Sequence, residues 1–173
     1  MRCGVEFAAL RAEPAESAEQ VTQVLRGEEL RVKERRGGWA LVRTDYDYPG
    51  WIRESDLVGG APLDLARTFV GTPYEWGGMT SAGIDCSGLV HMAFRLAGRL
   101  VPRDAWQQAE AGKVVAEPVA GDIVVYGEPV DHVAFWVGDG RILHATGREE
   151  TRAVVEEEEP AALKERPRRV VRL

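Results

Sequence analysis

The sequence has few of the residues that build metal sites, disulfide frameworks and membrane spans. Its 173 residues include two cysteines and three histidines, and these lack the spacing of a four-ligand zinc site, so no metal site is expected. No apolar run approaches the ~20 residues that cross a bilayer, so no membrane span is expected. Acidic residues outnumber basic ones, for a net charge of −6, which argues against nucleic acid as a partner.

The N-terminus also lacks a secretory signal peptide, because the apolar stretch 7–10 is too short for an h-region. We therefore expect a cytoplasmic location, with secretion as the alternative if a leader has been removed. The first cysteine, Cys3, is expected to be a small buried residue or part of a fraying terminus. A disulfide between Cys3 and Cys86 is a competing arrangement that would consume the more informative of the two thiols.

Short segments with alternating apolar residues fill the first third of the chain. Turn-forming residues separate them, as at Arg36-Gly37-Gly38, and this pattern predicts a small β-barrel over residues 1–58. Residues 59–62 have turn formers and no periodicity, so they are predicted to be a linker. A second domain is expected over residues 63–173, beginning with a helix that Gly71-Thr72-Pro73 ends.

Cys86 lies at the predicted start of an amphipathic helix, after a glycine-rich loop. A single apolar stripe runs along this helix through Cys86, Leu89, Val90, Ala93 and Ala97. Asp85 suits the N-cap position, and Gly98 suits the residue after the C-terminus. A thiol at a helix start gains from the positive end of the helix dipole, so a thiolate is expected at Cys86.

A thiolate needs a base, and His132 and His144 each fall at a strand-like position. His91 is rotated roughly 140° from the thiol along the helix, so we expect it to lie away from the site. A thiolate with a histidine base, oriented by a third polar group, is the arrangement of a covalent hydrolase.

The register of a hairpin around Gly138-Asp139-Gly140 decides whether the two histidines meet. A two-residue turn would pair His144 with Phe135 and place the histidines on opposite faces. A three-residue loop would pair His144 with Ala134, which brings His132 onto the same face at a diagonal of about 7–8 Å. The catalytic interpretation therefore predicts that loop or an equivalent bulge.

Two charged runs near the C-terminus are not expected to have a function of their own. The acidic run 156–159 is expected to be a solvated surface segment. The basic run 166–169 precedes Val170-Val171, so it is expected to be the exposed side of a closing strand.

Several ordered motifs resemble the NlpC-type cell-wall cysteine peptidases, and the first third resembles the bacterial SH3-like domains that often precede them. The matching stretches are Gly71-Thr72-Pro73-Tyr74-Glu75-Trp76-Gly77-Gly78, Asp85-Cys86-Ser87-Gly88-Leu89-Val90, Pro102-Arg103-Asp104-Ala105-Trp106-Gln107-Gln108, Gly121-Asp122-Ile123-Val124, His132-Val133-Ala134-Phe135-Trp136-Val137-Gly138-Asp139-Gly140 and His144-Ala145. The resemblance implies an α+β chain: a papain-like peptidase domain, with the cysteine helix on an antiparallel sheet, after a small SH3-like β-barrel.

The resemblance also implies roles for individual residues. Cys86 would be the nucleophile, His132 the general base and acid, and His144 the polar group that orients His132. The Cys86 backbone N–H would donate to the oxyanion. Tyr74 would be a second oxyanion donor or, alternatively, a core aromatic beside the loop. No metal or cofactor is implied.

The implied substrate is a peptidoglycan stem peptide, cut between γ-D-glutamate and the diamino acid. In the subgroup with an SH3-like domain, residues at the positions of Asp85 and Ser87 help bind the free amine of a terminal L-alanine, although Asp85 also suits a helix cap. The pair Arg103-Asp104 is expected to contact the diamino-acid side or simply to cap the next helix.

Aromatic residues complete the expected substrate site. Trp76, in the glycine-rich loop, is expected at the site. Tyr46 and Tyr48 are the candidates from the SH3-like domain, and Tyr48 is the one we expect there.

The function predicted from the sequence is therefore a cysteine endopeptidase of murein peptide recycling, with a peptidoglycan-derived peptide as its partner. A secreted cell-wall hydrolase and a noncatalytic wall-binding module are the alternatives. An amidase or acyltransferase on the same scaffold is compatible with the same residues.

Overall fold

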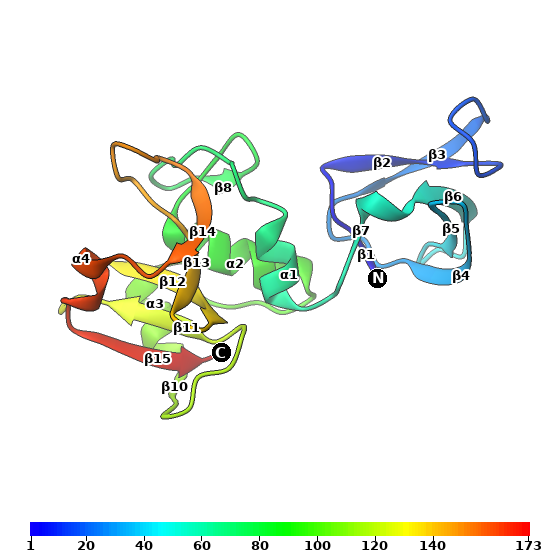
Figure 1. Ribbon diagram of the computed structural model, residues 1–173. Coiled ribbons are helices and arrows are strands. Elements are labelled where there is room, and N and C mark those ends of the chain that lie inside the picture. The colour runs from blue at the N-terminus through cyan, green and yellow to red at the C-terminus, as the bar shows by residue number, and fades with distance from the viewer. The chain divides into compact units, whose positions relative to one another are not determined.

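The computed structural model describes residues 1–173, which form two compact units, Met1–Gly60 and Ala61–Leu173 (Figure 1). The division falls inside the segment 59–62, where the sequence predicts a linker. None of the helices combines the length and the apolar character that crossing a bilayer requires.

The first unit consists almost entirely of short antiparallel strands. They are β1 (Arg2–Cys3), β2 (Phe7–Arg11), β3 (Gln20–Leu25), β4 (Arg31–Arg36), β5 (Trp39–Arg43), β6 (Pro49–Arg53) and β7 (Leu57–Val58), with a 3-10 helix at Glu54–Asp56. Five strands form a sheet in the order β3-β2-β6-β5-β4, and β1 pairs with β7. Alternating apolar residues of these strands, such as Leu10, Val42 and Ile52, are fully buried in its core. The expected all-β first domain is confirmed.

The second unit packs helices against one antiparallel sheet. Its elements are α1 (Pro62–Arg67), β8 (Met79–Thr80), β9 (Gly83–Ile84), α2 (Cys86–Leu96), α3 (Ala105–Ala111), β10 (Lys113–Val114), β11 (Ile123–Tyr126), β12 (His132–Gly138), β13 (Arg141–Ala145), β14 (Val154–Glu158), α4 (Ala161–Lys164) and β15 (Arg168–Arg172). The six-stranded sheet has the order β10-β15-β11-β12-β13-β14, and β8 pairs with β9. This is the expected α+β architecture.

Helix α2 lies on the sheet with its apolar stripe inward. Leu89, Val90 and Ala93 are fully buried, and the ring of Phe94 stacks on that of Phe135 in β12, 6.1 Å between centroids. The predicted ends are confirmed, because Asp85 is the N-cap and Gly98, with φ at 84°, follows the C-cap. The first predicted helix is shorter than expected, since α1 ends at Arg67 and leaves Val70 exposed.

The hairpin of β12 and β13 reaches the predicted alignment by a bulge. The turn has two residues, Asp139 and Gly140, both with positive φ, so the three-residue loop is wrong. A bulge at Val137 shifts the register back by one residue, and Trp136 pairs with Ile142. His144 is thereby aligned with Ala134, and both histidines lie on one face of the sheet.

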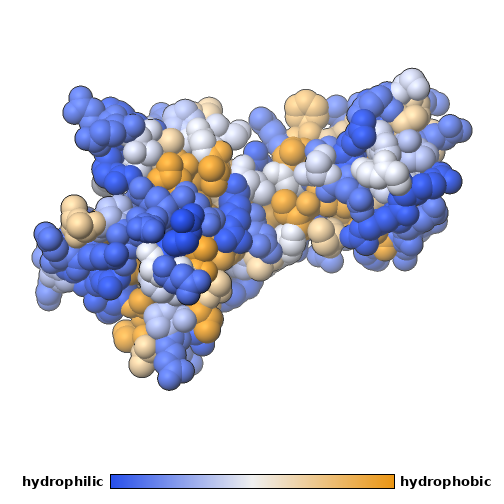
Figure 2. Space-filling model, in the orientation of Figure 1, coloured by the Kyte–Doolittle hydropathy of each residue, from blue (hydrophilic) through white to orange (hydrophobic).

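Hydrophilic residues cover most of the face of the molecule seen in Figure 2, with smaller apolar patches between them on both units. The basic run 166–169 is half-buried to exposed and leads into β15, as expected.

Candidate active site

Cys86 is the first residue of α2, and 5% of its surface is exposed. The preceding residue fixes this helix start, because the Gly88 N–H donates to Asp85 Oδ1 at 2.7 Å. The loop before the helix also passes very close to it. A Cβ at Gly88 would lie 2.4 Å from the Gly78 carbonyl oxygen, so only glycine fits there.

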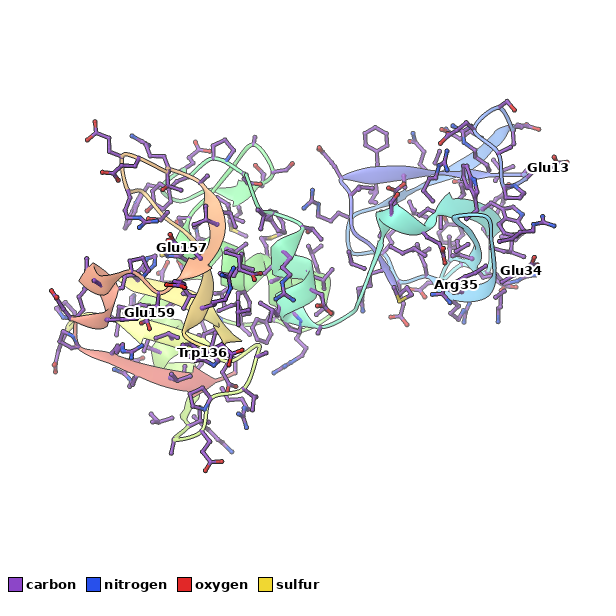
Figure 3. The ribbon with its side chains drawn as sticks, in the orientation of Figure 1. Glu13, Glu34, Arg35, Trp136, Glu157 and Glu159 are labelled. Carbon is purple, nitrogen blue, oxygen red and sulfur yellow. The ribbon has the colours of Figure 1, made fainter.

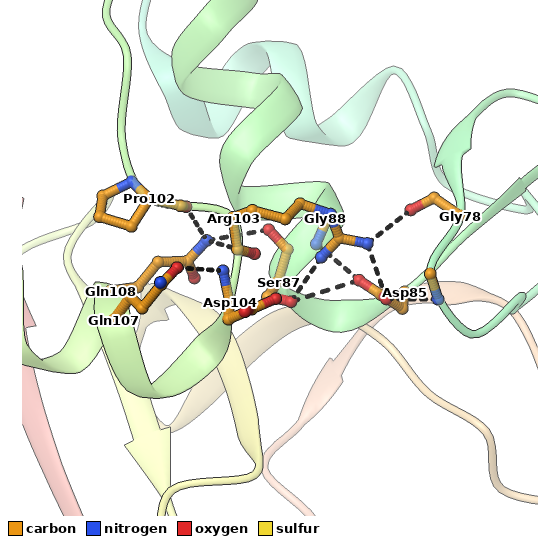
Figure 4. Close-up of polar contacts among 10 residues, drawn as sticks. Gly78, Asp85, Ser87, Gly88, Pro102, Arg103, Asp104, Gln107 and Gln108 are labelled. Atoms are coloured by element: carbon orange, nitrogen blue, oxygen red, sulfur yellow. Dashed lines mark hydrogen bonds and ion pairs between the residues drawn. The ribbon is translucent and has the colours of Figure 1, made fainter.

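A buried polar network surrounds Asp85 (Figure 4). Its Oδ2 accepts from Arg103 Nη2 and from the Gly77 N–H, both at 2.8 Å. Arg103 also donates to Ser87 Oγ at 2.8 Å, while Ser87 donates to Asp85 Oδ1 at 3.3 Å. Burial alone would raise the pKa of Asp85, but the Arg103 and backbone hydrogen bonds outweigh it and lower that pKa below 3.8.

The capping expected of the Arg103-Asp104 pair is found at Asp104, and contact with the diamino acid stays a prediction. Asp104, not Arg103, caps α3, in a capping box with Gln107. Arg103 instead holds the residues on both sides of the thiol. Buried Gln108 keeps the Arg103 segment in place by donating to the carbonyls of Ser87 and Pro102, both at 2.9 Å.

The expected resting thiolate at Cys86 is wrong in this environment. Burial raises the pKa of the Cys86 thiol to about 11, and the backbone groups of Val133, Ser87 and Cys86 itself offset only part of that effect. The charge on Asp85 raises the pKa further. The helix dipole favours a thiolate at this position, but packing against the sheet removes the solvent that a thiolate needs.

The two downstream histidines form a hydrogen-bonded pair. His132 Nε2 lies 2.8 Å from His144 Nδ1, and the rings meet edge to face with centroids 5.1 Å apart. Burial, and then the positive charge of a protonated His144, lowers the pKa of His132 to about 3. Burial also lowers the pKa of His144 below its ordinary value, so both rings are neutral in the free protein at pH 7. His91 faces elsewhere, with Nδ1 2.8 Å from the Val101 carbonyl oxygen.

Cys86 approaches the strand that carries His132. The backbone of Val133, the residue after His132 in β12, is close enough to the Cys86 thiol to lower its pKa, against the larger effect of burial. A cavity of about 560 Å³, the Cys86 cavity, is lined by Cys86, Asp85, Ser87 and Arg103, and a second of about 470 Å³, the histidine cavity, by His132 and His144. Trp76 and Asp131 line both, so the two cavities are neighbours. Cys86 and Cys3 are both free, which excludes the disulfide.

The aromatic residues predicted at the site lie in three different settings. Tyr74 lines the histidine cavity, and burial followed by the charges of Cys86 and Asp85 raises the pKa of its hydroxyl. Trp76 is 82% exposed. Tyr48 belongs to the first unit, where its hydroxyl lies 3.5 Å from the Val21 carbonyl oxygen. Its role in binding stays a prediction.

The sequence missed one carboxylate that contacts the histidine pair. Glu157, labelled in Figure 3, lies in the acidic run expected to be solvated. Its Oε1 nevertheless accepts from His144 Nε2 at 2.9 Å and from Arg148 at 2.5 Å. Glu159, in the same run, is 3% exposed and accepts from the Tyr126 hydroxyl at 2.8 Å and from Arg168 at 2.5 Å. Strand pairing explains the position of Glu157. Val155 in β14 pairs with His144 in β13, and Glu157, two residues after Val155, is the diagonal neighbour of His144.

Two family models match this chain. Residues 71–167 match the family model described as NlpC/P60 family. The chain belongs to the NlpC/P60 family. Residues 10–57 match the model described as bacterial dipeptidyl-peptidase Sh3 domain. The papain-like α+β fold and the SH3-like first domain expected from the sequence are both confirmed.

Individual relatives of this NlpC/P60 chain match parts of it. A Bacillus subtilis protein named gamma-D-glutamyl-L-lysine dipeptidyl-peptidase is 37% identical over 110 residues, which is 55% of this chain and 37% of that protein. The peptidoglycan hydrolase RipB of Mycobacterium tuberculosis has a TM-score of 0.54 at 34% identity, over 62% of this chain and 60% of RipB. An NlpC/P60 family protein from Bacillus cereus has a TM-score of 0.62 over 99% of this chain and 62% of its own, at 24% identity, which supports the fold alone. The chain thus spans well under two thirds of the length of the named Bacillus subtilis relative.

Replacing Arg103 by alanine should destabilise the second unit. Asp85, whose side chain is 8% exposed, would lose its cation, at a cost of about 2 kcal/mol in the free energy of unfolding at pH 7. Because Asp85 has a lowered pKa in the folded state, this loss is present above the ordinary pKa of 3.8 and shrinks as the pH falls through the folded value. Denaturant titrations at pH 7 and pH 3 measure it. Arg169→Ala, at an exposed arginine of β15, is the matched control, and an equal loss for R103A at both pH values would contradict the argument.

The raised pKa of Cys86 predicts a slow thiol at neutral pH. With a pKa of about 11, about one thiol in ten thousand is ionised at pH 7. The rate of alkylation by iodoacetamide should climb steadily from pH 7 to pH 10. The Cys86→Ala protein corrects for Cys3. A flat, high rate between pH 5 and pH 8 would instead reveal a resting thiolate–imidazolium pair.

Proposed function

We propose that this chain is a cysteine endopeptidase that hydrolyses the bond between γ-D-glutamate and the diamino acid of peptidoglycan stem peptides. The observation that carries the proposal is the hydrogen-bonded pair of His132 on β12 and His144 on β13, whose cavity neighbours the cavity lined by Cys86. The named activity of the Bacillus subtilis relative supports the choice of bond.

The reaction begins with an uncharged thiol and an uncharged imidazole. His132 Nε2 is engaged with His144, so Nδ1 is the nitrogen left to take the Cys86 proton. As the proton leaves, sulfur bonds to the peptide carbonyl carbon and the carbonyl oxygen becomes an oxyanion. The Cys86 backbone N–H, at the start of α2, and the Tyr74 hydroxyl are the proposed donors to that oxyanion.

The tetrahedral species then collapses. The carbon–nitrogen bond breaks as His132 returns the proton to the leaving amine, and a thioester to Cys86 remains. Water attacks the thioester while His132 takes one of its protons, and that proton returns to sulfur when the acid product leaves. The thiol and the neutral imidazole are restored, so the cycle balances without a cofactor.

The proton transfers fix how the peptide lies. The leaving amine must reach the His132 ring, so the diamino acid occupies the histidine cavity. Arg148 and Arg166 line that cavity and match the carboxylate of a diamino acid. The L-Ala-γ-D-Glu portion then occupies the Cys86 cavity.

Recognition of a free L-alanine amine is the finer part of the proposal. The Cys86 cavity is lined by the carboxylates of Asp85, Asp104 and Asp131, and an ammonium group is attracted to such a cavity. Asp85 already accepts from Arg103 and two backbone N–H groups, so the amine adds to an existing set of donors. Free stem peptides, rather than intact wall, are then the expected substrates, and the cytoplasmic location stays a prediction.

Cleavage assays with matched peptides test the proposal. The protein is incubated with L-Ala-γ-D-Glu-L-Lys, its meso-diaminopimelate counterpart, the N-acetylated form of each, and intact sacculi, and the products are identified by mass spectrometry. We expect L-Ala-D-Glu and the free diamino acid from the unblocked peptides only. Replacing His132 by alanine should lower kcat by about 10²- to 10⁴-fold, because it removes the general base.

Each alternative gives a different product pattern. Cleavage of sacculi without cleavage of free peptides would favour a secreted wall hydrolase. Binding to sacculi that Cys86→Ala retains, without cleavage of any substrate by the unmodified protein, would favour a wall-binding module. Release of ammonia or acyl transfer would favour the amidase or acyltransferase.

A further inference from the structure

The carboxylate of Glu157 lies at the end of a hydrogen-bonded row that passes through both histidines. Its Oε1 lies 2.9 Å from His144 Nε2, and His144 Nδ1 lies 2.8 Å from His132 Nε2. Arg148 Nη2 contacts the same carboxylate oxygen at 2.5 Å. The proposed reaction steps do not use Glu157, and the pairing of β14 with β13 does not require a carboxylate at this position.

The chemistry of a carboxylate gives this row a direction. Arg148 and His144 both lower the pKa of Glu157, against the opposing effect of its burial, so the carboxylate is ionised and only accepts hydrogen bonds. His144 Nε2 must therefore carry a proton, and in a neutral ring its Nδ1 is then an acceptor. Because His144 Nδ1 accepts, His132 Nε2 must carry the proton that is donated to it. In a neutral His132 ring, Nδ1 then carries no proton.

We propose that Glu157 is a positioning residue that sets the tautomers of both histidines, so that His132 Nδ1 is available to take the Cys86 proton. The inference rests on the proposed function, because it gives Glu157 its role through the same site. Glu157 does not touch the reacting atoms and acts only through His144.

Glu157 also offsets the charge that the reaction creates on the histidines. When Cys86 passes its proton to His132, a positive ring appears in a buried position. Around that ring lie two arginines, Arg148 and Arg166, which disfavour the charge, and the carboxylate of Asp131, which precedes His132 and pairs with Arg166. Glu157 is the acceptor aligned with the pair: burial lowers the pKa of His144, and the hydrogen bond and charge of Glu157 offset part of that effect.

The test uses two neighbouring glutamates of β14. In Glu157→Gln the side chain keeps its size but loses its charge and gains an N–H donor, so it no longer enforces one tautomer of His144. Glu156→Gln is the matched control, because Glu156 belongs to the same acidic run, has a similar exposed fraction, and pairs with Arg67 and Arg141 instead.

We expect E157Q to lower kcat by about 10- to 100-fold, the usual cost of losing an outer partner of a functional histidine, with KM almost unchanged. E156Q should leave both constants unchanged, and thermal unfolding should show that both variants are folded. A kcat for E157Q equal to that of E156Q would overturn the proposal, as would a loss confined to KM.

A second measurement does not depend on catalysis or on folding of the variant. The ¹⁵N chemical shifts of the imidazole rings in the unmodified protein report which nitrogens carry protons. We expect Nε2–H for both His132 and His144. Protonation of His144 at Nδ1 would refute the role of Glu157 even if every stem peptide is cut, and Nε2–H in a protein that cuts none would refute the proposed function alone.

Discussion

A buried hydrogen bond between two imidazole rings constrains the rest of the site. The 2.8 Å contact of His132 and His144 requires that β12 and β13 align so that both rings leave the same face of the sheet. A two-residue turn alone would not give that alignment, and the bulge at Val137 corrects it. The contact also requires one ring to donate and the other to accept, so the tautomers of the pair are coupled.

The same burial decides which charges the site holds at rest. Cys86 is buried and His132 is partly buried, and this burial raises the pKa of the thiol and lowers that of the imidazole. The charged form of the pair is therefore disfavoured in the free chain. Asp85 stays ionised close by because Arg103 and backbone N–H groups surround it. The site thus keeps one ion pair, Asp85 with Arg103, beside a neutral thiol and a neutral imidazole.

Features set by neighbours in sequence were predictable, and those set by distant packing were not. The start of α2 followed from its apolar stripe and from Asp85, because a cap and its helix are local. The hairpin was predictable only as a choice between a loop and a bulge, since Gly138-Asp139-Gly140 suits either.

The thiolate expectation failed because strands far along the chain bury Cys86. Glu157 was missed because its alignment with His144 depends on how β13 pairs with β14. The connecting residues 146–153 form no helix or strand, so their sequence does not fix that register. Arg103 was left between two roles because its partner Asp85 lies 18 positions earlier in the chain.

The position of Trp76 affects the fluorescence of the protein. Its indole lines the Cys86 cavity and the histidine cavity and is 82% exposed in the free chain. A molecule that fills both cavities displaces water from that ring, and indole emission responds to such a change in polarity. The chain therefore carries its own fluorescent indicator of occupancy, readable without labels and without turnover.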